Sequence, residues 1–232
     1  GPVGDQPALL THNEVTTLFH EFGHGLHHLL TQVEVAAVSG INGVPWDAVE
    51  LPSQFMENWC WQPEALALIS GHFESGESLP QEMLDKLLAA RNFQAAMQMV
   101  RQLEFSLFDV RIHQQGSTLE PGRVQAVLND VREQLSVVPV VPDNRFQHGF
   151  SHIFAGGYAA GYYSYKWAEV LSADAFSRFE EEGVFNAATG QAFLRSILQR
   201  GGSDEPMVLF ADFRGRAPSI EPLLRHSGLL SS

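Results

Sequence analysis

The chain contains 232 residues, of which 44% are hydrophobic and 18% are charged, a balance that is ordinary for a globular protein. Its formal net charge of −13 argues against nucleic acid and anionic membranes as partners, because no basic stripe displaces phosphate counterions. No apolar run approaches the roughly 20 residues that span a bilayer, and the first residues lack the order of a signal peptide. Neutral or basic peptides remain open as partners.

The single cysteine, Cys60, lies between Trp59 and Trp61. Because one thiol forms no internal disulfide, we expect a reducing compartment and a cytoplasmic location. A cysteine flanked by tryptophans is more typical of a buried small hydrophobe than of a catalytic nucleophile.

The predicted elements are mostly helical, and the first begins at a capping box formed by Thr11 and Glu14. Apolar residues then repeat at helical spacing, which predicts a helix over residues 11–32. β-Branched residues predict a short strand over residues 33–38. A loop is expected from there to residue 46.

Further helices are predicted from proline positions and apolar periodicity. They are expected over residues 47–61, a short segment after Pro63, a long segment from Pro80 to about residue 115, residues 121–135 and residues 158–182. In the first of these, Pro52 is expected either to kink the helix or to mark its first turn. Residues 137–142 are expected to be extended, because β-branched residues alternate with prolines there. Two or three short helices complete a mainly α chain with at most a small short-stranded β element. We predict one domain over residues 1–232.

The first predicted helix carries His20, Glu21 and His24 in an H-E-x-x-H pattern. At 3.6 residues per turn the two histidines lie on one helical face, where both rings reach a single tetrahedral Zn²⁺. Glu21 is one position round the helix, where its carboxylate takes a proton from a zinc-bound water. The alternative interpretation is a helix with two solvated histidines and an ordinary glutamate.

A catalytic zinc needs a third protein ligand, and the spacing leaves several candidates. Leu30 occupies the position at which a metzincin has its third histidine. His27 lies a full turn beyond His24, so a hydrogen bond in the shell around the metal ligands suits it better than a bond to the metal. Glu50 is the stronger candidate, but its spacing from Asp47 also matches a helix cap, so both roles remain open. Asp47 is either part of that cap or orients a zinc-bound histidine.

All four tyrosines of the chain fall between Tyr158 and Tyr165. Three of them, Tyr158, Tyr162 and Tyr165, have the i, i+4, i+7 spacing of one helical face, whereas Tyr163 points elsewhere. An aromatic core stripe is one explanation. The other is that phenol O–H groups donate to the oxyanion formed at a peptide carbonyl, with His152 as a further donor. Two glycines, at 156 and 157, would let the segment move as a lid.

These segments together resemble the thimet oligopeptidase family of zinc metallopeptidases, over essentially the whole chain. The matching residues are His20 to His24, Glu50-Leu51-Pro52-Ser53-Gln54, and His152 to Tyr165. The resemblance implies a zincin-like helical catalytic domain that cuts short peptides in a deep channel. It also implies that Glu50 is the third ligand of one Zn²⁺.

The same resemblance implies a role for each remaining site residue. Glu21 matches the general base, and His152 matches a histidine near the scissile bond. Tyr158 and Tyr165 match the tyrosines that engage the substrate carbonyl or the tetrahedral intermediate, with Tyr162 as a further member. The spacing between residues 152 and 158, like that between residues 40 and 50, varies by one residue between branches of the family.

Family members are much longer, and the part without a counterpart here is the N-terminal half. Gly1 to Gly4 is typical of a linker, so we expect a C-terminal portion or a separately encoded catalytic domain. The sequence therefore predicts a zinc metalloendopeptidase acting on short oligopeptides. The alternative is a zinc-containing module that binds peptides or a partner without cleaving them. A purely structural zinc site is disfavoured, because it would leave Glu21 without a role.

Overall fold

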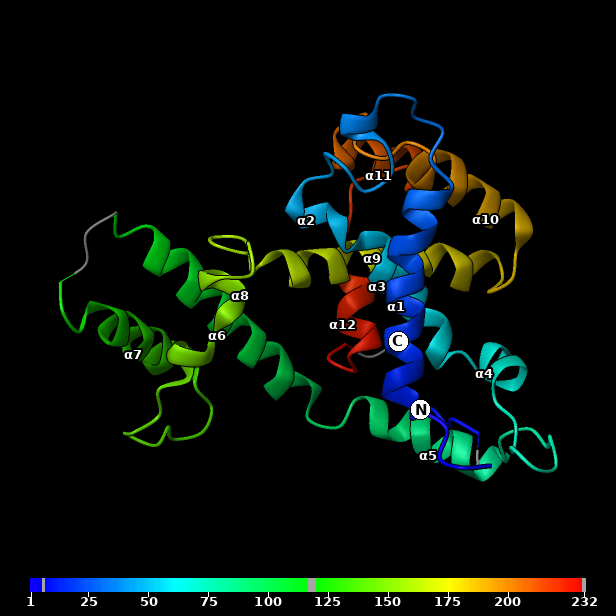
Figure 1. Ribbon diagram of the computed structural model, residues 1–232, viewed down its shortest axis with the longest axis horizontal. Helices are drawn as coiled ribbons and strands as arrows, with labels where there is room; N and C mark the ends of the chain where they lie inside the picture. The colour runs from blue at the N-terminus through cyan, green and yellow to red at the C-terminus, as the bar shows by residue number, and fades with distance from the viewer. Residues whose placement is uncertain (6, 117–119, 231–232) are drawn as a thin grey trace. The chain divides into compact units, whose positions relative to one another are not determined.

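A computed structural model describes residues 1–5, 7–116 and 120–230 (Figure 1). The described residues form helices and turns, with no β-strand among them, so the mainly α fold class is confirmed. They divide into two compact units, one made of residues 1–93 and 168–232 and the other of residues 94–167. The single domain expected from the sequence stays a prediction.

The first unit holds both chain ends and most of the helices. Its elements are α1 His12–Leu29, η1 Ala36–Val38, α2 Trp46–Val49, α3 Leu51–Glu57, η2 Asn58–Trp61, α4 Pro63–Ile69, α5 Gln81–Arg91, the larger part of α9 Ser164–Glu182, α10 Ala187–Phe193, η4 Leu194–Leu198, α11 Pro206–Arg214 and α12 Glu221–His226. None of the described helices has the length and apolar character that a membrane crossing requires.

Helix α1 begins as the sequence predicts. The backbone N–H of Thr11 donates to the Glu14 carboxylate at 2.7 Å, and the Glu14 N–H donates back to the Thr11 hydroxyl at 3.3 Å. This reciprocal cap satisfies donors that a helix start otherwise leaves unpaired. The capping box therefore fixes where the motif-bearing helix starts.

The core of the first unit is aromatic and lies behind α3. Phe55 stacks on Phe193 with ring centroids 3.9 Å apart, and Trp59 meets Phe176 edge to face at 4.8 Å. Such pairs contribute about 0.5–1.5 kcal/mol beyond the burial of their area. Since Phe55 belongs to α3, this core holds α3 in place against the rest of the unit.

Two sequence predictions in this unit are corrected. The strand over residues 33–38 is wrong: η1 occupies its second half, and the N–H of Val38 bonds to the carbonyl of Val35 at 3.0 Å. β-Branched residues without a partner strand have no ladder to join. The helix over residues 47–61 is broken at Glu50, because Pro52 has no N–H and instead lies in the first turn of α3.

The second unit consists of α6 Ala95–His113, α7 Arg123–Leu135, η3 Phe146–Gly149 and α8 Ser151–Phe154, followed by the start of α9. Helices α6 and α7 lie side by side, as the green ribbons of Figure 1 show. Phe108, Leu128 and Val131 are fully buried between them. A buried ion pair joins the helices, with the Arg132 guanidinium 3.0 Å from the Glu104 carboxylate.

Two long predicted helices are shorter than expected. The helix from Pro80 to residue 115 is divided into α5 and α6, because Gln94 adopts a left-handed φ of 55° between them. The helix over residues 158–182 begins at Ser164, because Ala160 also has a φ of 55°. A non-glycine residue in this conformation ends a right-handed helix. The shared helical face predicted for the tyrosines is therefore wrong.

Candidate metal centre

The two histidines of the H-E-x-x-H pattern lie one turn apart on α1. Their ring centroids are 5.0 Å apart and the ring planes are nearly perpendicular. The Nε2 atom of His20 is 3.3 Å from one carboxylate oxygen of Glu50, and the Nε2 atom of His24 is 3.1 Å from the same oxygen. Two imidazole nitrogens and a carboxylate oxygen thus converge on one point.

Glu50 reaches this point from the junction between α2 and α3. The N-cap residue of α2 is Pro45 and that of α3 is Glu50, and neither makes a side-chain capping hydrogen bond. The Glu50 side chain is instead buried, and the Ser53 hydroxyl donates to it at 2.9 Å. The serine holds the carboxylate towards α1.

Close approach of α1 and α3 depends on Gly23, which is between the motif residues. A Cβ atom at this position would lie 2.5 Å from the Pro52 carbonyl oxygen and 2.5 Å from the Ser53 Cα. Both are backbone atoms of α3, so no side-chain rotation would relieve the contact. The glycine therefore sets the distance between the histidine helix and the element that carries Glu50.

The electrostatics of the cluster favour positive charge. Burial raises the pKa of the Glu50 carboxyl, but hydrogen bonds from His20, His24 and Ser53 outweigh burial and hold that pKa well below its usual range. The hydrogen bond to Glu50, and then that to Glu57, raises the pKa of His20 to about 10. Glu50 is thus a carboxylate at neutral pH, and protons or a metal ion compensate its charge.

The donor set fits a metal ion. The ligand atoms of His20, His24 and Glu50 all lie within 4.8 Å of one another, and they form the one such group of three among the described residues. Imidazole nitrogen with carboxylate oxygen suits zinc better than the all-oxygen sets of magnesium or calcium. Three protein ligands also leave a coordination position open, as catalytic sites require.

The remaining motif residues differ in their surroundings. Glu21 is exposed, and none of the described residues forms an ion pair or hydrogen bond with its carboxylate. His27 is buried, has no hydrogen-bond partner on either ring nitrogen within the described chain, and does not belong to the ligand group. Asp47 lies in the first turn of α2, and its orienting role stays a prediction.

A residue that the sequence reasoning missed is Glu57, at the end of α3. Its carboxylate oxygen is 2.7 Å from the Nδ1 atom of His20. The signal available in the sequence was spacing, because Glu57 follows Glu50 by seven residues, about two helical turns. Two carboxylates at that spacing share a helical face.

The predicted aromatic residues gather inside the second unit, although they do so without a common helix. The rings of Tyr158 and Tyr165 stack with centroids 4.9 Å apart, and the His152 ring is 6.2 Å and 6.3 Å from them. Tyr162 is buried beside Tyr165, and its hydroxyl donates to Gln102 at 3.0 Å. The hydroxyl of Tyr162 is therefore engaged with the protein itself.

Asp109 of α6 holds the segment that carries these tyrosines. Its fully buried carboxylate accepts the backbone N–H of Ala160 at 2.9 Å and that of Tyr162 at 2.8 Å. His113, one turn along α6, lies 2.8 Å from the same carboxylate. These bonds stabilise the left-handed conformation of Ala160, which delays the start of the predicted helix to Ser164.

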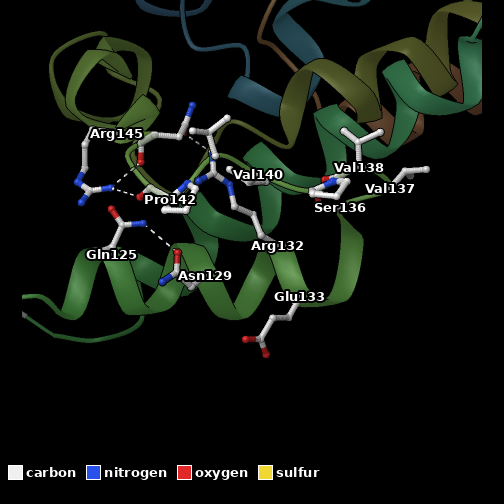
Figure 2. A pocket seen from close by; sticks show the side chains of 13 residues that line it. Gln125, Asn129, Arg132, Glu133, Ser136, Val137, Val138, Val140, Pro142 and Arg145 are labelled. Carbon is white, nitrogen blue, oxygen red and sulfur yellow. Dashed lines mark hydrogen bonds between the residues drawn. The ribbon is translucent and has the colours of Figure 1, made fainter.

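One pocket of the second unit contains none of the predicted site residues. It has a volume of about 700 Å³ and lies between α7 and residues 136–145, as Figure 2 shows. The Gln125 amide donates to Asn129, and the Arg145 guanidinium donates to the Pro142 carbonyl.

An H-E-x-x-H helix with a third ligand, a carboxylate, from the junction of two later helices is a donor arrangement typical of zinc metallopeptidases. The comparison with known proteins agrees. The chain belongs to Peptidase family M3, whose model matches residues 1–229. The resemblance to the thimet oligopeptidase family is thereby confirmed.

Several relatives are similar over nearly the whole chain. Oligopeptidase A of Salmonella typhimurium is 64% identical over 228 residues, which cover 98% of this chain and 34% of the relative. The probable cytosolic oligopeptidase A of Arabidopsis thaliana is 52% identical over 239 residues, covering 100% of this chain and 34% of the relative. Dipeptidyl carboxypeptidase of Escherichia coli is 38% identical over 233 residues, covering 98% and 34%. The chain thus spans about a third of the length of these relatives.

Proposed function

We propose that this chain is the catalytic part of a zinc metalloendopeptidase that hydrolyses peptide bonds in short oligopeptides. Its zinc ligands are His20, His24 and Glu50. The observation that carries the proposal is the convergence of their ligand atoms within 4.8 Å. The names of the oligopeptidase A relatives support oligopeptides as the substrate class.

When bound, a zinc ion acts as a Lewis acid and lowers the pKa of a coordinated water towards about 7. The protein's own contribution begins with Glu21, whose exposed carboxylate has no competing partner among the described residues. Glu21 takes the proton of the attacking water and passes it to the leaving amine. The charge on Glu50 keeps both histidine rings turned towards one point.

Hydrogen-bond donors for the developing oxyanion come, in this proposal, from Tyr158, Tyr165 and His152. Their rings form one cluster in the second unit, which supports a joint role. A phenol O–H donates to an oxyanion without carrying charge itself. Tyr162 has its hydroxyl bonded to Gln102, so its part in the proposal is to pack behind Tyr165.

The working enzyme is further proposed to include an additional N-terminal part, which the coverage of only 34% of the Salmonella typhimurium relative supports. We propose a cytoplasmic location, which the name of the probable cytosolic relative supports.

The test is Glu21→Gln, which removes the base and keeps the size of the side chain. Zinc content should persist, while cleavage of an internally quenched peptide should fall by orders of magnitude. Glu64→Gln, at an exposed glutamate in the first turn of α4, is the matched control and should retain activity. Cleavage that survives Glu21→Gln would show that the mechanism is wrong.

A chelator distinguishes the enzyme from a non-catalytic peptide-binding module, which the short span relative to the known peptidases keeps open. Activity that disappears with chelator and returns with zinc supports the enzyme. Peptide binding without turnover, in a chain that retains zinc, supports the module.

A further inference from the structure

We infer that Glu57 is a positioning residue for the metal centre: it holds the His20 ring so that Nε2 faces the ligand point shared with His24 and Glu50. The inference rests on the proposed function, because it assigns a role behind the zinc ligands. It concerns a residue that touches neither the ligand point nor the attacking water.

The geometry assigns one ring nitrogen of His20 to each of two carboxylates. Nδ1 is 2.7 Å from Glu57, and Nε2 is 3.3 Å from Glu50. An imidazole has two nitrogens only, so a neutral ring that donates Nδ1–H to Glu57 presents its lone pair from Nε2. Glu57 therefore selects the tautomer that a metal ligand needs.

The second histidine provides an internal contrast. The Nδ1 atom of His24 is buried and has no hydrogen-bond partner among the described residues. Only His20 is oriented by a carboxylate from behind. Removal of Glu57 should therefore alter the orientation of the His20 ring. The His24 ring should keep its position, because the helix determines it.

The two carboxylates stand at opposite ends of one short helix, α3. Glu50 precedes α3 and Glu57 is its last residue, so they lie about two turns apart on the face that packs against α1. His20 lies between them, with one nitrogen towards each. The core contacts of Phe55, which is also in α3, fix the spacing of both carboxylates at once.

Glu57 has no cation that would explain its position as an ordinary surface ion pair. No lysine or arginine of the described chain forms a salt bridge with it. It lines a pocket of about 390 Å³ together with His20 and the polar residues Asn13, Thr16 and Thr17. Its hydrogen-bond partner there is the histidine.

The expected consequence is a change in metal affinity. Loss of a hydrogen-bond partner behind a metal-bound histidine lowers affinity by about 10–100-fold. Glu57→Ala should show that loss. Glu57→Gln should weaken zinc binding less, because an amide oxygen still accepts Nδ1–H but carries no charge.

The experiment measures the zinc dissociation constant of the whole chain by competition with a chromogenic chelator. Wild type, Glu57→Ala and Glu57→Gln are compared, with Glu64→Ala as an exposed control in the same unit. The unfolding free energy of each metal-free variant is measured in parallel. A loss of zinc affinity in Glu57→Ala at unchanged stability supports the inference, and affinity within about twofold of wild type overturns it.

A measurement on the wild type keeps the inference testable if Glu57→Ala does not fold. The ¹⁵N spectrum of the zinc-loaded chain should show His20 as the Nδ1–H tautomer, and an Nε2–H signal would overturn the inference. A wild-type chain that binds no zinc would overturn the proposed function as well. If both Glu57 variants bound zinc with wild-type affinity, the inference would be overturned while the proposed function would stand.

Discussion

The contact between α1 and α3 makes Gly23 the position where one added methyl group should disturb the metal centre most. In Gly23→Ala the new Cβ would lie 2.5 Å from two backbone atoms of α3, whereas ordinary contacts begin at 3.4 Å. Helix α3 would have to retreat by about 0.9 Å to restore an ordinary contact. The retreat carries Glu50 away from the two histidines.

The magnitude follows from two opposing effects. Overpacking of this kind destabilises proteins by about 1–3 kcal/mol. Replacing a mid-helix glycine by alanine stabilises by up to about 1 kcal/mol. Gly25→Ala isolates the second effect, because its Cβ would meet nothing within 4 Å on the same helix. We expect Gly23→Ala to be less stable than Gly25→Ala by about 1–3 kcal/mol.

Urea unfolding of the metal-free variants measures this difference, and chelator competition measures zinc affinity. Metal–ligand distances tolerate changes of about 0.2 Å, so a retreat several times larger should weaken zinc binding in Gly23→Ala alone. If Gly23→Ala matched Gly25→Ala in both unfolding free energy and zinc affinity, the argument that Gly23 sets the ligand distance would be refuted.

Two further predictions concern buried polar groups. Burial lowers the pKa of His27 from 6.5 to about 4, so the metal-free chain should lose up to about 3 kcal/mol of stability as the pH falls from 6.5 to 4. Unfolding of His27→Gln across this range should show a flatter dependence, and an unchanged slope would contradict the assignment. Asp109→Ala leaves the N–H groups of Ala160 and Tyr162 without their acceptor and should destabilise the chain by at least about 2 kcal/mol. The exposed Asp130→Ala is its control, and equal unfolding free energies of the two variants would rule out the anchoring role.

Local features of this protein could be predicted from the sequence because their interactions span few residues. The capping box at Thr11 and the apolar spacing after it define the start of α1. The placement of His20 and His24 on one face follows from helix geometry alone. Spacing alone left Glu50 either as a zinc ligand or as part of a helix cap. The resemblance to a known family favoured the ligand role.

The tertiary structure decided what depends on distant segments. Glu50 meets His24 across 26 residues and Glu57 meets His20 across 37, because α3 packs on Gly23 and on an aromatic core. The tyrosine segment departs from its predicted helix because Asp109, 51 residues before Ala160, accepts its backbone N–H groups. A sequence pattern encodes hydrogen bonds within a turn, whereas the meeting of remote side chains is set by which helices bury their faces together.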